Sequence, residues 1–259
     1  MMPAMTTPVP RGTKRGAGFL TRRRGEAVRV DASPPSSDAA ADALPERHAS
    51  NSRYAPLWNP SSEADAIRQI YNTDNEDAFE QGGRWDFDRL APWFDESSTV
   101  LDRGIGRVAR FVAPKCARLW AVDVSQAMLD MTAERLGHPD NVSYAICQDV
   151  TFSDVPSGSV DLAYSLLVLQ HVEREDAFLL LEELRRVIRP TGTVVVNYPN
   201  LLSDTYLECF VEYAHNGAAV EASRARLYTP QEVERVMGAA GFRAELQSET
   251  NIRVLAHPA

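Results

Sequence analysis

Two carboxylates and two glycines in the middle of the chain have the spacing of a nucleotide-binding site. Asp102 ends a short apolar run, Gly104 and Gly106 follow it, and Asp123 ends the next apolar run. The first glycine permits a sharp bend, and the second lets the backbone approach a ligand that a Cβ atom would hold away. A carboxylate at the end of the second strand is placed to accept hydrogen bonds from a ribose diol. This order predicts strand, glycine turn, helix, strand and acid, the nucleotide-binding half of a doubly wound sheet.

The segments that follow alternate between helical and strand patterns, as such a sheet requires. Ser125 is a suitable N-cap for a helix that Gly137 ends, and Thr229-Pro230-Gln231-Glu232 has the pattern of a capping box before a helix that Gly241 ends. Residues 199–227 show little regularity. The other predicted elements are strands over 142–147, 160–165 and 193–198, a helix over 174–189, and two final strands over 242–247 and 252–257. The predicted fold class is α/β, with a doubly wound, seven-stranded, mostly parallel sheet that ends in a C-terminal antiparallel hairpin.

Three regions are predicted along the chain. Residues 1–55 are rich in proline, alanine, serine and arginine without periodicity, which predicts a disordered basic tail. Residues 56–97 are predicted to form a helical cover, with one helix over 62–81 that Gly82-Gly83 ends and a second apolar piece after it. Residues 98–259 are predicted to form the α/β domain. The cover is equally well explained as a lid over the ligand site or as protection for the sheet edge.

The charge distribution disfavours a nucleic-acid partner. The net charge is −9, and seven basic residues and one acidic residue give positions 1–30 a charge of +6, which leaves −15 for the rest. Binding to nucleic acid relies on neutralising phosphates, so an acidic body favours a small-molecule partner.

The composition is typical of a soluble globular protein. Apolar residues make up 44% and charged residues 24% of the chain, and no run of about 18 apolar residues indicates a membrane span. The three cysteines, Cys116, Cys147 and Cys209, are far apart, and the five histidines are scattered. We therefore predict no disulfide, no metal site and a reducing, cytoplasmic location.

Taken together, the motifs resemble those of the class I S-adenosylmethionine-dependent methyltransferases, closest to the small-molecule type. The resemblance covers residues 98–257 and rests on the order and spacing of several short motifs. These motifs are Val100–Gly106, Val122–Ser125 with Met128, Gln148–Val150, Ser159–Leu162, Gln170–Val172, Arg189–Gly192, Tyr228–Pro230 and Ala240–Phe242. A Rossmann-like methyltransferase fold is the architecture that this resemblance implies.

The resemblance also implies a cofactor, S-adenosyl-L-methionine, and an enzymatic activity. The expected reaction is methyl transfer from the sulfonium to O, N or C of a small-molecule acceptor. In such enzymes the glycine turn holds the methionine end, the acid after the second strand holds the ribose, the acid after the third strand holds the adenine, and the backbone after the fourth strand takes the methionyl amine. The residues implied as cofactor-binding are Asp102, Gly104, Gly106, Asp123, Val124, Met128, Asp149, Val150 and Leu166.

The glycine turn departs from the family pattern at two positions. The family usually has three alternating glycines; here the third position is Val108, or two residues are missing between Asp102 and Gly106. Arg103 replaces the usual apolar residue, which makes the turn more cationic.

Two other functions fit part of the pattern. Gly104-x-Gly106-x-x-Ala109 with Asp123 also fits a dinucleotide fingerprint, but Asp102 would repel a pyrophosphate and would attract a cationic donor. A methyltransferase-like interaction module without cofactor binding is the second alternative, supported only by the shortened turn.

Several residues have both a structural and a functional interpretation. His171 follows the fourth predicted strand, where it is a candidate general base or a cap of the next helix. Asp161 is expected to stabilise the sheet or a turn rather than to contact substrate. Tyr206, Tyr213 and His215 lie where an acceptor-binding cover often sits, although packing explains such aromatics equally well.

Overall fold

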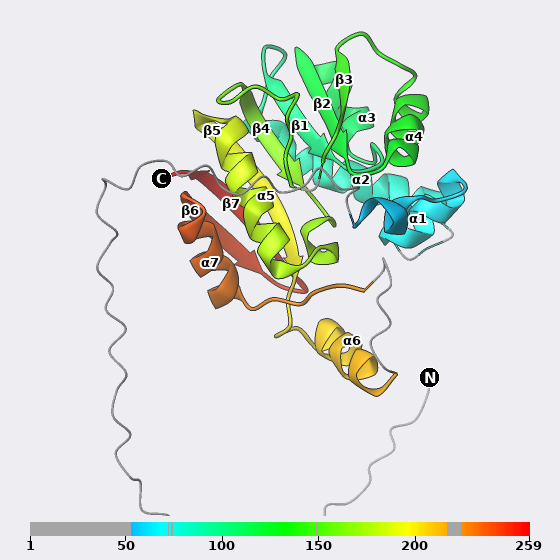
Figure 1. Cartoon of the computed structure of the whole chain (residues 1–259), viewed down its shortest axis with the longest axis vertical. Helices are drawn as coiled ribbons and strands as arrows, with labels where there is room; N and C mark the ends of the chain where they lie inside the picture. The colour runs from blue at the N-terminus through cyan, green and yellow to red at the C-terminus, as the bar shows by residue number, and fades with distance from the viewer. Residues whose placement is uncertain (1–52, 72, 74, 149, 217–223) are drawn as a thin grey trace, which may run out of the picture. The chain divides into compact units, whose positions relative to one another are not determined.

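A computed structural model describes residues 53–71, 73, 75–148, 150–216 and 224–259. Its seven strands form one sheet in the order β3-β2-β1-β4-β5-β7-β6 (Figure 1). The five strands from β3 to β5 pair in parallel, and β7 is antiparallel to both β5 and β6. The strands are β1 (Thr99–Arg103), β2 (Arg118–Asp123), β3 (Val142–Ile146), β4 (Val160–Ser165), β5 (Ile188–Pro199), β6 (Phe242–Ser248) and β7 (Asn251–Pro258). The predicted fold class, including the terminal antiparallel hairpin, is confirmed.

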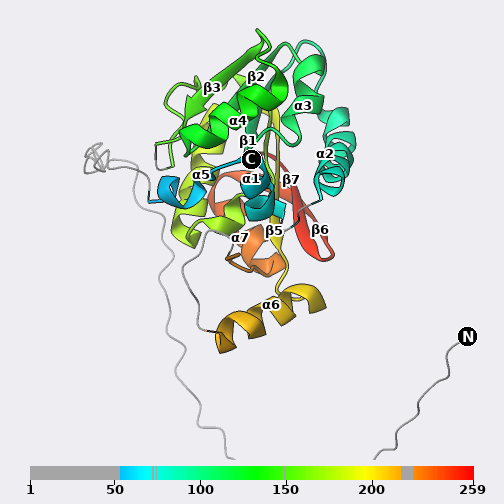
Figure 2. The same ribbon diagram turned by 90° about the vertical axis from the view of Figure 1, so that its right-hand side faces the viewer.

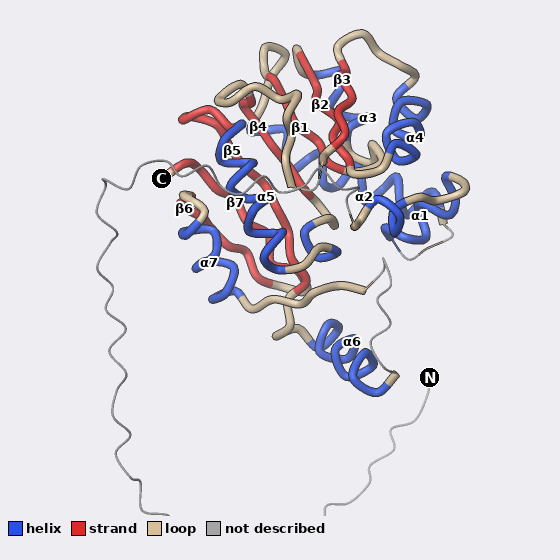
Figure 3. The backbone as a smooth tube through the Cα atoms, in the orientation of Figure 1, coloured by secondary structure: helices blue, strands red, loops and turns tan. Residues whose placement is uncertain are grey.

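Helices separate most of the consecutive strands along the chain, but β4 follows β3, and β7 follows β6, without a helix between them (Figure 3). The α-helices are α1 (Glu63–Tyr71), α2 (Glu76–Leu90), α3 (Ala109–Val112), α4 (Gln126–Leu136), α5 (Arg174–Val187), α6 (Asp204–His215) and α7 (Pro230–Ala239). The short 3₁₀ helices are η1 (Ala55–Trp58), η2 (Ala91–Trp93), η3 (Ala113–Lys115) and η4 (Leu169–His171). No helix among the described residues is long and apolar enough to cross a membrane.

The predicted helix caps are confirmed. Ser125 accepts a hydrogen bond from the Met128 amide at the start of α4, and Gly137 ends that helix with a left-handed φ of +73°. Thr229 and Glu232 form the capping box of α7. These local signals fix where the two helices start.

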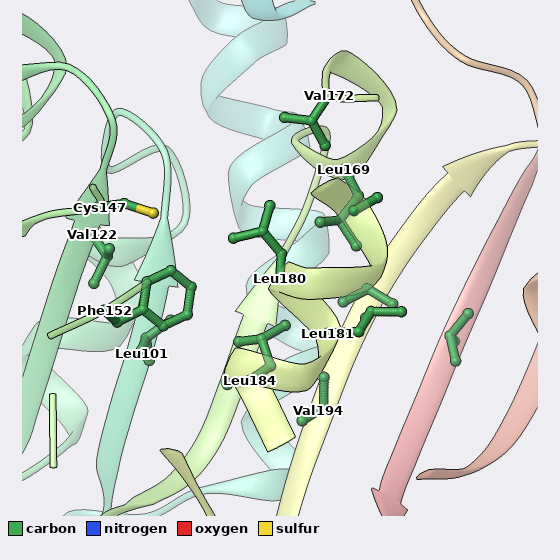
Figure 4. Packing of buried hydrophobic residues seen from close by; sticks show 14 of the residues in the cluster. Leu101, Val122, Cys147, Phe152, Leu169, Val172, Leu180, Leu181, Leu184 and Val194 are labelled. Atoms are coloured by element: carbon green, nitrogen blue, oxygen red, sulfur yellow. The ribbon is translucent and has the colours of Figure 1, made fainter. Parts of the chain in front are cut away.

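The sheet is covered by apolar side chains on both faces. On one face, Leu180, Leu181 and Leu184 of α5 pack towards the strands (Figure 4). On the other face, Phe87 and Leu90 of α2 join α3 and the strands in a second cluster. Figure 2 shows α2 and α5 on different sides of the sheet. Coverage of both faces explains why the central strands are almost continuously apolar.

Gly82-Gly83 does not end a helix, so that prediction is wrong. The Asn75 side chain accepts from the Ala78 amide to cap α2, and α2 then continues through both glycines. A Cβ atom on Gly83 would lie 2.4 Å from the carbonyl oxygen of Arg107. Gly83 therefore permits close packing of α2 against the turn that contains Arg107, a tertiary requirement that overrides the low helix propensity of glycine.

Tyr54 belongs to the folded part of the chain, although the sequence placed it in the tail. Its side chain is buried, and its hydroxyl accepts from the Glu173 amide at 2.9 Å and hydrogen-bonds to the Asp176 carboxylate. The remainder of the predicted tail, residues 1–52, lies outside the described residues.

Residues 199–227 contain a helix that the sequence analysis missed. Ser203 caps α6 by accepting from the Tyr206 amide at 3.4 Å. None of the α6 residues is buried, and Leu207 and Phe210 are about half exposed. Because the apolar side chains of α6 do not enter the core, their spacing predicts a helix only weakly within this irregular part of the sequence.

Substitution of Gly83 tests the contact between α2 and the turn. Gly83→Ala is expected to reduce the free energy of unfolding by about 1–3 kcal/mol, because the added methyl group overlaps a backbone oxygen that cannot move freely. Gly238→Ala in α7 is the matched control: its Cβ would meet no atom within 4 Å, so alanine is expected to stabilise by about 0.5–1 kcal/mol. Urea denaturation measures both, and equal effects of the two substitutions would contradict the packing argument.

Candidate functional site

A cavity opens at the carboxyl ends of β1, β2 and β4. It comprises about 690 Å³ of space, part of it open to solvent. Seven of the nine residues predicted to bind the cofactor line it: Asp102, Gly104, Gly106, Asp123, Val124, Met128 and Leu166. Chain segments far apart in sequence therefore converge on one cavity, and the roles of these residues within it stay predictions.

The glycine turn has the backbone conformation that its sequence requires. Gly104 has φ of +139° and Gly106 has φ of +75°, both in the region that favours glycine. A Cβ atom on Gly106 would lie 2.8 Å from Leu136 Cδ1 and 3.0 Å from Thr132 Cγ2. Val108 has φ of −94°, an ordinary value, so the turn closes without a third glycine.

Asp102 is a buried acid on the wall of the cavity. Asp102 is 4% exposed, and its Oδ2 atom has no hydrogen-bond partner among the described residues. Burial raises the pKa of Asp102 to about 7, while the Tyr164 side chain and the Arg107 guanidinium oppose the rise. Asp102 is therefore an acid that would gain from a cationic or proton-donating ligand.

Asp123 is the second buried acid of the cavity. Its Oδ1 atom accepts a hydrogen bond from the Ser125 amide at 3.0 Å. Burial raises the pKa of Asp123, and the nearby Arg103 cation opposes this rise. Asp123 also lines the cavity, and its carboxylate can accept further hydrogen bonds.

Arg107 connects the turn to the cover helix and to the last strand. Its Nη2 atom lies 2.6 Å from Asp86 Oδ2 in α2, and Arg253 Nη2 of β7 lies 2.6 Å from the other oxygen of the same carboxylate. The side chains of Arg107 and Asp86 are only 7% and 12% exposed. This buried ion triplet holds α2 and β7 against the glycine turn.

The N-terminal segment supplies part of the cavity wall through Tyr54, Trp58 and Ile70. Trp58 and Ile70 belong to the predicted cover, as the lid interpretation requires, whereas Tyr54 was placed in the tail and none of the three was named as a site residue. The aromatic residues at positions 54 and 58 beside Pro56 are the signal that could have identified this segment, but the proline- and serine-rich residues around them obscured it.

The end of β4 has a strained backbone that leads to a second depression. Leu167 has φ of +61°, unusual for a non-glycine residue, and its amide donates to Asn197 Oδ1 at 2.7 Å. Leu167 lines both the cavity and a more open groove beside Trp85, Asp86 and Arg253. The two depressions therefore meet at this residue.

Val150 and the candidate base His171 are not among the residues that line the cavity. Asp149 lies outside the described residues, and Val150 is partly buried against the main core cluster. His171 is buried in η4; its ring lies edge-on to Trp58, with centroids 5.0 Å apart, and its Nε2 atom lies 3.1 Å from Gln170 Nε2. The roles of these residues stay predictions.

Asp161 has the structural position expected of it. Its Oδ2 atom accepts from the Thr99 amide at 2.8 Å, and it pairs with Arg189. It therefore joins the start of β1 to the start of β5, away from the carboxyl ends of the strands. Within the described ranges, no three His, Cys, Asp or Glu side chains gather at a potential metal site.

Comparison with known proteins agrees with this geometry. Residues 101–196 match the family model described as a methyltransferase domain. The chain is 24% identical over 153 residues to phosphoethanolamine N-methyltransferase of Plasmodium falciparum (isolate 3D7), which covers 58% of this chain and 55% of that enzyme. It is 33% identical over 96 residues to an uncharacterized protein of a Streptomyces fradiae transposon, covering 37% of this chain and 27% of that protein. The matched part of this chain thus spans about half or less of the length of these relatives.

A solved structure shares the architecture. Magnesium protoporphyrin IX methyltransferase from Synechocystis PCC 6803, with bound SAH, superposes with a TM-score of 0.59 at 16% identity, covering 79% of this chain and 98% of that one. The fold of this chain is thus the Rossmann-like fold that this methyltransferase has, and residues 101–196 match a methyltransferase domain.

The raised pKa of Asp102 predicts a pH dependence of stability. Above the ordinary carboxyl pKa the unfolded chain ionises, while folded Asp102 stays protonated up to about pH 7. The folded state then binds more protons, so this group contributes less stability as pH rises from about 4 to 7. Asp102→Asn cannot ionise, so its stability relative to wild type is expected to rise over this range by at most about 4 kcal/mol.

Urea denaturation of both proteins between pH 4 and 8 measures this effect. The exposed Asp140→Asn is the control, and it is expected to show no comparable trend. A stability difference between Asp102→Asn and wild type that is constant with pH would refute the assignment.

Proposed function

We propose that this protein transfers a methyl group from S-adenosylmethionine to O, N or C of a small-molecule acceptor. The observation that carries the proposal is the convergence of Asp102, the Gly104–Gly106 turn and Asp123 on one cavity. The whole chain's activity is part of the proposal, because its curated relatives are matched over only part of their length.

The residues present fit this donor. Asp102 offers an unpartnered carboxylate oxygen, and Gly104 has no atom within 4 Å of where a Cβ would stand, so the turn leaves room for a ligand. When bound, S-adenosylmethionine supplies an electrophilic methyl group on a cationic sulfur. Two acids can attract such a cation, whereas they would oppose the pyrophosphate of a dinucleotide.

The protein's own contribution is to bind, orient and exclude water. Tyr54 and Trp58 cover the cavity with buried rings, which lowers the local dielectric and strengthens the attraction between the acids and a cation. Orientation of the two reactants is the main catalytic effect that this arrangement can supply.

The groove beyond Leu167 is the route that we propose for the acceptor. It adjoins the cavity, and Trp85, Arg89 and Arg253 lie along it. The Plasmodium relative is named for phosphoethanolamine, which supports a small acceptor. The general-base role of His171 stays a prediction: His171 does not line the cavity, and its ring contacts Trp58, which does.

We also propose a cytoplasmic location. All three cysteines are free thiols, which fits a reducing compartment.

Calorimetric titration with S-adenosylmethionine, S-adenosylhomocysteine and NAD tests the proposed function. We expect micromolar binding of the first two and none of NAD. Asp123→Ala is expected to weaken S-adenosylhomocysteine binding at least about tenfold, because hydrogen bonds to a carboxylate are lost. The exposed Asp130→Ala, on the neighbouring helix α4, is the control and should bind normally.

Each other result has a defined meaning. Binding of neither methyl donor nor product would leave the interaction module as the better account. Binding of NAD alone would establish the dinucleotide alternative. Normal affinity of Asp123→Ala would remove the ribose-binding role from this acid.

A further inference from the structure

We propose that Arg103 binds the ribose of the donor together with Asp123, donating hydrogen bonds to the hydroxyl oxygens whose protons Asp123 accepts. This inference rests on the proposed function and adds a second ribose-binding residue at a position where an apolar side chain is usual.

Arg103 is a buried cation whose hydrogen bonds are incomplete. It ends β1, lines the cavity and is 5% exposed. Its Nε and Nη1 atoms have no hydrogen-bond partner in the part of the chain that the structure describes. A buried guanidinium without partners is costly, so its retention at the cavity indicates that a ligand supplies the acceptors.

Arg103 lies close enough to the second acid for their charges to interact. Both residues line the same cavity, Arg103 at the end of β1 and Asp123 at the end of the neighbouring parallel strand β2. The positive charge of Arg103 acts on Asp123, where it opposes the effect of burial on the pKa of that carboxyl.

A vicinal diol complements this pair of charges. Each hydroxyl group has one proton to donate and lone pairs that accept. The Asp123 carboxylate can only accept, and the Arg103 guanidinium can only donate. A ribose between them can therefore satisfy both, which an apolar residue at position 103 could not achieve.

Calorimetry with paired ligands and the variant Arg103→Leu tests the inference. The ligands are S-adenosylhomocysteine, 5′-methylthioadenosine, which keeps the ribose but lacks the amino-acid end, and the 2′-deoxy analogue of S-adenosylhomocysteine. Arg103→Leu is expected to weaken the binding of S-adenosylhomocysteine and of 5′-methylthioadenosine by the same factor, about tenfold. Binding of the deoxy analogue should weaken by clearly less. Arg103→Lys keeps the charge without the planar fork and should fall between wild type and Arg103→Leu.

A matched control and a folding check accompany the variants. Arg118→Leu removes an exposed arginine from the opposite end of the neighbouring strand β2 and should leave all three affinities unchanged. Thermal melting establishes that each variant is folded. If Arg103→Leu does not fold, Arg103→Lys gives the same comparison between the three ligands.

Three results would overturn the inference. Weaker binding of S-adenosylhomocysteine alone would mean that Arg103 binds the donor's carboxylate. Equal weakening of all three ligands that disappears at pH 9 would mean that Arg103 only keeps Asp123 ionised. Unchanged affinities would mean that Arg103 contacts no ligand. If wild type itself binds none of the ligands, the proposed function has failed instead.

Discussion

The ion triplet of Arg107, Asp86 and Arg253 is the interaction on which the ligand site depends. Arg107 directly follows Gly106, so the conformation of the turn and the position of this guanidinium are linked. Asp86 binds both cations at 2.6 Å, one from the turn and one from β7. Loss of the shared carboxylate would leave two poorly solvated cations, which is far more costly than loss of an exposed pair.

Close packing reinforces this electrostatic link. Arg107 lies within 6 Å of the ring centres of Tyr71 and Phe79, and Gly83 brings α2 against its carbonyl oxygen. The cover is therefore attached to the turn itself as well as to the sheet. Arg107 also acts on Asp102, so the same residue that positions the turn moderates the charge of the acid beside it.

The sequence predicted those features that depend on local chemistry. The glycine turn, the Ser125 and Thr229 caps and the two strand-end acids all have short-range causes, and the structure brings both acids to one cavity. Gly82-Gly83 misled the prediction because the partner that requires glycine is Arg107, far along the chain. The residues around Gly82-Gly83 in the sequence do not indicate this tertiary contact.

Other features depended on the tertiary structure in different ways. Tyr54 is separated from its partner Glu173 by more than a hundred residues, and it stands among residues typical of a tail. The missed helix α6 buries none of its residues, so its apolar side chains were not selected by packing in a core and did not predict a helix. The positive φ of Leu167 has no sequence signal, because leucine rarely adopts it.

The position of β7 has a consequence for synthesis of the protein. β7 follows all other strands in sequence, yet it lies between β5 and β6 in the sheet. While the chain leaves the ribosome, one edge of β5 consequently stays open, because β6 has no direct pairing with it. Unpaired strand edges invite association with other chains. Since Arg253 belongs to β7, the strand that closes this edge also supplies the second cation that pairs with Asp86.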